Sequence, residues 1–158
     1  MASVTPDNRF VIFTSGREGL QSPWIVPIDG GAPREIAKVF AGVSAFTSPD
    51  GKSLVFRSRD EQGRAIVVMC ELPDCGSRRT LAIPSPPRSW TPDGRALAYI
   101  DAAQKNVWVQ PIDGVPRQLT HFTDGRTIVD FAWSSNGARL AISRSTTTSD
   151  VVMFKGLK

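Results

Sequence analysis

A short turn sequence returns four times along this chain at a constant spacing of 43 residues. It reads Pro-Asp-Asn at 6–8, Pro-Asp-Gly at 49–51 and at 92–94, and Ser-Asn-Gly at 135–137. A period of about 40 to 45 residues is typical of β-propellers, in which each repeat forms one four-stranded blade. Helical repeats of similar length need long segments with a hydrophobic period of about 3.6 residues, and no such segment is visible. The repeat therefore predicts an all-β chain.

The residue types of the turn explain why it recurs. Proline presets the φ angle of the second turn position, aspartate hydrogen-bonds nearby backbone groups, and glycine adopts the left-handed conformation at the exit. The first copy has Asn8 where the others have glycine, and asparagine tolerates this conformation better than other non-glycine residues. We therefore expect one backbone geometry in all four turns.

Apolar segments around each turn account for four strands per repeat. A strand whose centre is almost continuously apolar follows each turn, at 9–15, 52–58, 95–101 and 138–144. Continuous apolarity predicts burial on both faces, as in a blade between two neighbours. A short first strand precedes the turn at 42–48 and 128–135, and a further hairpin follows at 22–36, 65–81 and 106–120. In the first and last of these hairpins, Asp-Gly at 29–30 and 113–114 marks the connection between strands.

These segments predict a partial β-propeller of about four four-stranded antiparallel blades, incomplete at both ends. The repeats span approximately 1–38, 39–83, 84–122 and 123–158. The first begins within its first strand, and the last is expected to stop at a third strand, 151–158. We expect the partners of this segment to be missing upstream blades or further copies of itself, because open blade faces and edges favour association.

Bulk composition excludes several classes of protein. With 158 residues, of which 41% are apolar and 22% charged, the chain matches ordinary soluble domains. No window approaches the roughly 18 uncharged apolar residues of a membrane helix, so direct membrane insertion is not expected. The net charge of +4 comes from 19 cations interspersed with 15 anions, and the longest basic run is Arg78-Arg79. Without a basic stripe, nucleic acid is not an expected partner.

Two patterns within the repeats resemble a known family. The segments 49–56, 24–36 and 108–120 are similar to the Pro-Asp repeats of TolB-like β-propeller proteins. The end of the chain, ARLAISRSTTTSDVVMFKGLK, together with CELPDC, further resembles the C-terminal propeller of large bacterial proteins, often serine/threonine kinases of the acidobacterial type. This resemblance implies a sensor or interaction role in a periplasmic or other extracytoplasmic location, with the cytoplasm as the alternative. Kinase motifs are absent from the sequence.

The sequence offers no catalytic constellation. The single histidine is His121, and no GxSxG nucleophile motif occurs, so we expect no enzyme activity. Cys70 and Cys75 are too few for a structural zinc site; they form either a disulfide, in an oxidising compartment, or two free thiols. Asp124 and Asp130 lack the dense carboxylate pattern of calcium loops, so no metal or cofactor is expected. The four tryptophans are expected to fill blade interfaces, at positions 24, 90, 108 and 133.

Arginines in the connections between second and third strands form the candidate binding set. These connections, at 15–22, 58–64 and 143–150, are expected to share one face of the ring. They bring together Arg17, Arg57, Arg59, Arg64 and Arg144. Arginine is enriched at interaction hot spots, so this set predicts a basic rim that meets an acidic peptide or protein.

The sequence thus predicts a non-catalytic β-propeller module for protein or peptide recognition, within a larger bacterial protein. Two alternatives remain open. In the first alternative, the chain is the propeller gate of a prolyl oligopeptidase-like peptidase whose hydrolase domain is absent from this sequence. In the second, it is a structural half-ring that associates with itself.

Overall fold

The computed structural model describes residues 2–16, 21–37, 45–147 and 153, and this part of the chain contains β-strands and no helix. The strands are β1 (Ala2–Val4), β2 (Phe10–Ser15), β3 (Ser22–Pro27), β4 (Arg34–Glu35), β5 (Phe46–Thr47), β6 (Ser53–Arg59), β7 (Ala65–Glu71), β8 (Arg78–Leu81), β9 (Pro87–Trp90), β10 (Ala96–Ile100), β11 (Val107–Pro111), β12 (Arg117–Gln118), β13 (Thr127–Trp133) and β14 (Leu140–Ser145).

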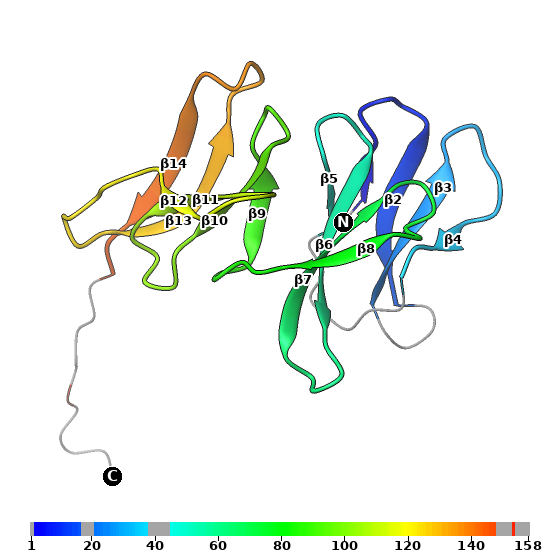
Figure 1. The fold of residues 1–158 in the computed structure, drawn as a ribbon. Coiled ribbons are helices and arrows are strands. Elements are labelled where there is room, and N and C mark those ends of the chain that lie inside the picture. Colours follow the sequence, from blue (N-terminus) through cyan, green and yellow to red (C-terminus); the bar gives the residue numbers. More distant parts are fainter. Residues whose placement is uncertain (1, 17–20, 38–44, 148–152, 154–158) are drawn as a thin grey trace, which may run out of the picture.

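Consecutive strands pair into separate antiparallel sheets (Figure 1). Blade 1 is β1–β4, blade 2 is β5–β8 and blade 3 is β9–β12, each with its strands in sequence order. Blade 4 comprises β13 and β14 within the described residues. The predicted fold class, a partial β-propeller of antiparallel blades, is confirmed. The predicted first strand at 42–48 is described only from 45 onward, and the predicted third strand at 151–158 lies outside the described residues except for Met153.

The four turns have one geometry, and a hydroxyl group that precedes the proline position organises it. Each hydroxyl donates to the side-chain oxygen two residues later, at 2.6 Å in the first three copies and 2.8 Å in the fourth. It also accepts from the backbone amide five residues later, at 2.9 to 3.0 Å. The hydroxyls belong to Thr5, Ser48, Thr91 and Ser134. Asn8, Gly51, Gly94 and Gly137 have φ angles of 56°, 72°, 69° and 70°, as the sequence predicted.

Contacts between successive turns hold the blades in register. A Cβ atom on Gly51 would lie 3.4 Å from Pro6 Cδ, and one on Gly94 would lie 3.5 Å from Pro49 Cδ. At Gly137 the distance to Pro92 Cβ would be 2.8 Å, which no real Cβ atom tolerates. Glycine therefore serves twice, because it permits the left-handed φ and lets the proline of the preceding blade approach closely.

Three apolar clusters lie between successive blades. We call the face of a blade toward the preceding blade its leading face, and the opposite face its trailing face. Ile12 of blade 1 packs in one cluster with Leu54 and Phe56 on the leading face of blade 2. Val55, on the trailing face of blade 2, packs with Leu97 of blade 3. The third cluster joins blades 3 and 4. Burial between sheets thus replaces a single central core.

The two-sided burial predicted for second strands depends on neighbours. All five residues of β10 are buried, between blades 2 and 4. In β14, by contrast, Leu140 and Ile142 pack toward blade 3, whereas Ala141 is exposed. The prediction of two buried faces for 138–144 is therefore wrong, because no described residue covers the trailing face of blade 4.

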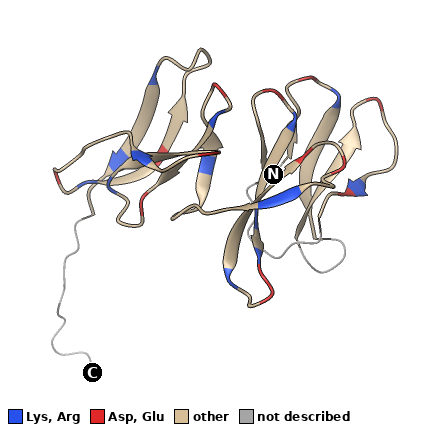
Figure 2. Cartoon of the chain, viewed as in Figure 1, with Lys and Arg blue, Asp and Glu red and all other residues tan. Residues whose placement is uncertain are grey.

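Charged residues of both signs are spread over all four blades (Figure 2). Neither sign is confined to one part of the described chain in this view. Among the described residues, no helix long and apolar enough to cross a membrane is present.

Candidate functional site

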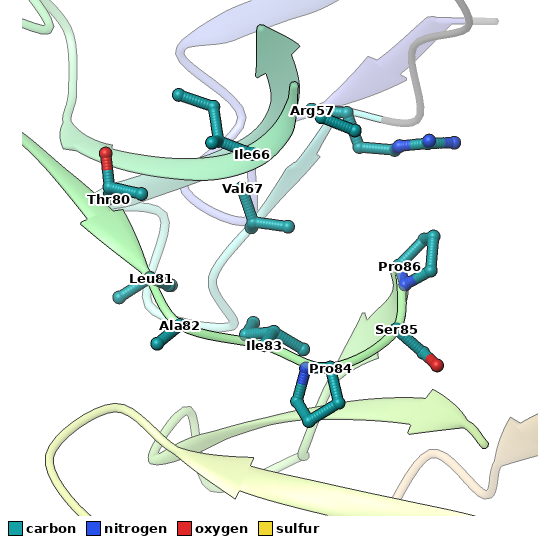
Figure 3. A pocket seen from close by; sticks show the side chains of 11 residues that line it. Arg57, Ile66, Val67, Thr80, Leu81, Ala82, Ile83, Pro84, Ser85 and Pro86 are labelled. Atoms are coloured by element: carbon teal, nitrogen blue, oxygen red, sulfur yellow. The ribbon is translucent and has the colours of Figure 1, made fainter. Parts of the chain in front are cut away.

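A pocket of about 350 Å³ lies beside blade 2, at the connection that leads to blade 3 (Figure 3). Its walls are β6 and β7 at Arg57 and 65–67, and the stretch from β8 into the connection, 80–86. The connection contains Pro84 and Pro86. Because proline has no amide hydrogen and a fixed φ, this segment does not extend the sheet and instead leaves a hollow beside β7.

Most of the pocket lining is apolar. Val67 is buried and belongs to the cluster between blades 2 and 3, against which Leu81 and Ile83 pack. Figure 3 shows Ile66 and Arg57 on one side, with Ile83 to Pro86 facing them. The walls therefore suit an apolar group on a ligand.

Arg57 supplies the only charge in the pocket lining. It lies on β6 directly opposite Val67 of β7 and is half-buried. Its guanidinium forms no hydrogen bond or ion pair with any described residue. A half-buried cation without a counter-charge favours an anionic ligand, since carboxylates bind guanidinium groups through two parallel hydrogen bonds.

The other described arginines of the predicted set already have partners. Arg59 donates to the Gly63 carbonyl at 2.6 Å, and Arg64 Nε donates to Asp60 at 2.7 Å. Both partners belong to the same hairpin, so these guanidinium groups stabilise the β6–β7 connection. Arg17 lies outside the described residues. The basic rim formed by the five arginines therefore stays a prediction, and three of its four described members already pair with neighbouring groups.

Arg144 is held within blade 4. Its guanidinium forms an ion pair with Asp124 and lies over the Phe122 ring, 3.7 Å from the ring centroid. Hydrogen bonding from Arg144 lowers the pKa of the Asp124 carboxyl. Asp124 is thus an ion-pair partner, and its role follows from a contact across 20 residues of sequence.

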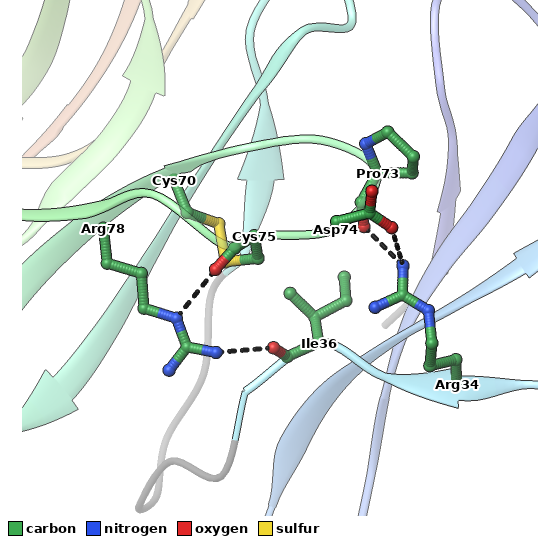
Figure 4. The surroundings of a disulfide bond; sticks show 7 residues. All are labelled: Arg34, Ile36, Cys70, Pro73, Asp74, Cys75 and Arg78. Carbon is green, nitrogen blue, oxygen red and sulfur yellow. Dashed lines mark hydrogen bonds and ion pairs between the residues drawn. A yellow bond between two sulfur atoms is a disulfide. The ribbon is translucent and has the colours of Figure 1, made fainter.

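Cys70 and Cys75 form a disulfide with Cα atoms 4.9 Å apart (Figure 4). Both residues are 1% exposed, in the cluster between blades 1 and 2. Arg78 donates to the Cys75 carbonyl and to the Ile36 carbonyl of blade 1, both at 3.0 Å. Arg34 of blade 1 donates to the Pro73 carbonyl at 2.6 Å. The disulfide therefore shapes a turn that contacts the neighbouring blade.

The remaining candidates have no ligand chemistry around them. His121 is exposed. Trp90 and Trp133 pack in the clusters between blades, and Trp24 stacks on Phe13 with ring centroids 6.5 Å apart. Within the described part of the chain, no three His, Cys, Asp or Glu side chains gather as a metal site would require.

The comparisons with known proteins agree on the fold. The chain superposes on TolB from Acinetobacter baumannii with a TM-score of 0.71 and 19% identity, covering 89% of this chain and 36% of that one. For a TolB-like protein from Agrobacterium tumefaciens the TM-score is 0.64 with 18% identity, over 89% and 63% of the two chains. The β-propeller domain of the Trilobed protease from Pyrococcus furiosus gives 0.50 and 16%, over 76% and 41%.

These likenesses establish a TolB-like propeller fold. The chain spans 36% and 63% of the lengths of the two TolB structures. No protein-family model matches the sequence, and the search of curated proteins found no match.

Proposed function

We propose that this chain is a non-catalytic propeller module that recognises a protein or peptide through a carboxylate group bound at Arg57. One observation carries this proposal. A half-buried arginine without a partner borders a pocket that is otherwise uncharged and mostly apolar. Such a pocket discriminates by charge at one point and by shape along its walls. The ligand we propose is a peptide segment with a Glu, Asp or terminal carboxylate beside an apolar side chain.

The surroundings of the pocket support a recognition role. Val67 and the neighbouring cluster fix one wall between two blades, so the site is built on a rigid element. The connection that forms the other wall contributes Ala82, Ile83 and Ser85, whose side chains hold no charge that would compete for Arg57. A ligand carboxylate therefore meets a preorganised cation.

We further propose that the module acts in an extracytoplasmic sensor, as part of a larger bacterial protein of the kinase-associated kind. The Cys70–Cys75 disulfide supports this location, because such bonds persist mainly in oxidising compartments. The TolB-like fold is compatible with it. A peptidase gate is not favoured, since the likeness to a protease propeller extends to fold alone.

Binding of paired peptides tests the proposal. A fluorescent peptide library that places glutamate next to leucine or isoleucine is screened, and each binder is compared with its glutamine counterpart. We expect the Glu-to-Gln change to weaken binding about 10- to 100-fold, as charged hydrogen bonds contribute about 1.5–3 kcal/mol. The Arg57→Gln variant should bind both peptides equally weakly.

Arg64→Gln is the matched control, because Arg64 lies in the same blade and pairs with Asp60 on the surface. It should bind like the wild type. Carboxylate-dependent binding that survives in Arg57→Gln would refute the assignment, and so would a library in which glutamate never improves binding.

A further inference from the structure

A second pocket, of about 360 Å³, lies between blades 2 and 3 and adjoins the pocket at Arg57. One wall is formed by 79–82, from β8 into the connection, and the other by the turn between β11 and β12 of blade 3. The stretch 80–82 lines both pockets, and Figure 3 shows it beside the first of them. We call the two hollows the Arg57 pocket and the Val115 pocket.

The Val115 pocket is lined mainly by apolar side chains. Leu81 and Ile112 take part in the lining and also pack against the apolar cluster between blades 2 and 3. Pro111 and Pro116 add the carbon atoms of their rings. Val115 is 82% exposed, so most of its apolar surface meets water. An apolar ligand group stabilises such a surface, because both partners remove apolar area from water.

The one charged side chain that lines the Val115 pocket is already paired. Arg79 Nη1 forms an ion pair with Asp113 at 2.9 Å, and its Nη2 donates to the Ile112 carbonyl at 3.2 Å. Arg57, in contrast, forms no hydrogen bond or ion pair with any described residue. The two pockets therefore differ in chemistry: the first favours an anion, and the second favours an uncharged apolar group.

The turn that forms the outer wall of the Val115 pocket is held from two sides. Within blade 3, the buried Gln110 side chain donates to the Pro111 carbonyl at 2.9 Å and to the Gly114 carbonyl at 2.7 Å. From blade 2, Arg79 bonds the same turn through Asp113. Because these contacts exist without a ligand, the wall is preorganised, and less freedom is lost when a ligand binds.

The shared stretch 80–82 sets how far apart two anchors of one ligand lie. Three residues in extended conformation span about 7 Å at roughly 3.3 Å per residue. An extended ligand that follows this stretch covers the same distance with about two to three of its own residues. A ligand carboxylate at Arg57 therefore brings a side chain two or three positions away to the Val115 pocket.

We propose that the ligand of this module is an extended peptide with two anchors. An acidic residue binds at Arg57, and an apolar side chain two or three positions away binds in the Val115 pocket. This inference rests on the carboxylate site proposed above and adds the second anchor and its spacing. Once the first anchor is bound, the second binds as an intramolecular event, so the affinity rises beyond that of either anchor by itself.

Short fluorescent peptides test the second anchor. Each contains glutamate next to leucine, with serine and glycine elsewhere, and a further leucine two, three or six positions from the glutamate on either side. At two or three positions, on one side of the glutamate, we expect the further leucine to bind about 10-fold more tightly than alanine at the same place, as burial of about half of its side chain would give. At six positions we expect no gain.

Val115→Ser tests where the further leucine binds. This variant should reduce the gain from leucine to about 2- to 3-fold, since a large part of the apolar wall is lost. The preference for glutamate over glutamine should remain, because Arg57 is unchanged. Val129→Ser is the matched control: Val129 lies on β13 of blade 4 and is 52% exposed, and this variant should bind every peptide like the wild type. Circular dichroism checks the folding of both variants.

Two results would overturn the second anchor while leaving the carboxylate site intact. One is a leucine that gives no gain, or the same gain at all three spacings, in peptides whose binding still depends on glutamate and Arg57. The other is a gain that Val115→Ser leaves unchanged. Binding that never depends on glutamate would refute both proposals, so the failure of the carboxylate site is distinguished from the failure of the second anchor.

Discussion

Removal of one buried hydroxyl measures how much the repeated turn contributes to stability. Thr91 is one of three buried residues in the set, together with Thr5 and Ser48, and its hydroxyl accepts from the Ala96 amide at 3.0 Å and donates to Asp93 at 2.6 Å. Thr91→Val retains the shape and removes the hydroxyl. A buried amide left without a partner costs about 1–3 kcal/mol. We expect a loss of about 2–3 kcal/mol, including a reduced contribution from the largely exposed Asp93 bond.

The fourth repeat supplies a matched control. The Ser134 hydroxyl makes the equivalent bonds at the surface, so water replaces them and Ser134→Ala should cost less than about 1 kcal/mol. Urea titration followed by tryptophan fluorescence and circular dichroism gives both values. A loss of about 2–3 kcal/mol corresponds to a fall of about 4–12 °C in Tm for a domain of this size. Equal losses at Thr91 and Ser134 would refute the argument that burial sets the contribution.

Three further perturbations test other contacts of the fold. In urea titration, Gly137→Ala should lower the free energy of unfolding by about 2–3 kcal/mol and Gly63→Ala by about 1 kcal/mol. Both glycines have positive φ, but only a Cβ at Gly137 would clash with a proline, Pro92. Equal losses would contradict the close approach of Pro92 to Gly137. The hydrogen bond from the Thr91 hydroxyl lowers the pKa of Asp93 below 3.8, so the ionised Asp93 carboxylate stabilises the fold above that pH, and this stabilisation is lost as pH falls through the folded-state pKa. Asp93→Asn should therefore flatten the decrease of Tm at acid pH. An unchanged decrease in this variant would argue against a stabilising role of Asp93. Reduction of the disulfide, which closes a short loop, should lower the free energy of unfolding by about 2 kcal/mol; no change between reduced and oxidised protein would show that contacts with blade 1 suffice.

The fold was largely accessible from the sequence because the repeat encodes local geometry. The Pro-Asp-Gly turn predicts a residue with left-handed backbone conformation and a side-chain hydrogen bond. Both features depend only on residues within about six positions of one another. The hydroxyl at 5, 48, 91 and 134 was visible in the same alignment, and its period could have identified it as part of the motif. Only the structure shows that the same hydroxyl oxygen also accepts a hydrogen bond from the backbone amide five residues later. One oxygen therefore bonds both ends of the turn.

The pocket could not be predicted from the sequence in this way. Arg57 belonged to the predicted set, but nothing in its own strand distinguishes it from Arg59. The difference arises from the connection at 82–86, which packs beside β7 and offers no partner to Arg57. Likewise, Arg144 was predicted to be available, yet Asp124 and Phe122 from an earlier loop occupy it. Long-range contacts of this kind decide which charges remain available for ligands.

Burial of 138–144 was mispredicted for a related reason. Its sequence resembles that of 95–101, but burial of a blade face is a property of the neighbouring blade. The apolar residues of a strand show that its face can be buried by an adjacent blade. They do not show whether an adjacent blade is present.

A nuclear Overhauser spectrum across the turns tests the stacking of blades most directly. The structure predicts cross-peaks from the Hα protons of Gly51, Gly94 and Gly137 to the ring protons of a proline 45 residues earlier in each case, since a Cβ on each glycine would lie 2.8 to 3.5 Å from that ring. All three cross-peaks should appear together with the cross-strand peaks inside each blade. Intact cross-strand peaks without the three glycine–proline peaks would show that the sheets form but do not stack, and would contradict the propeller arrangement.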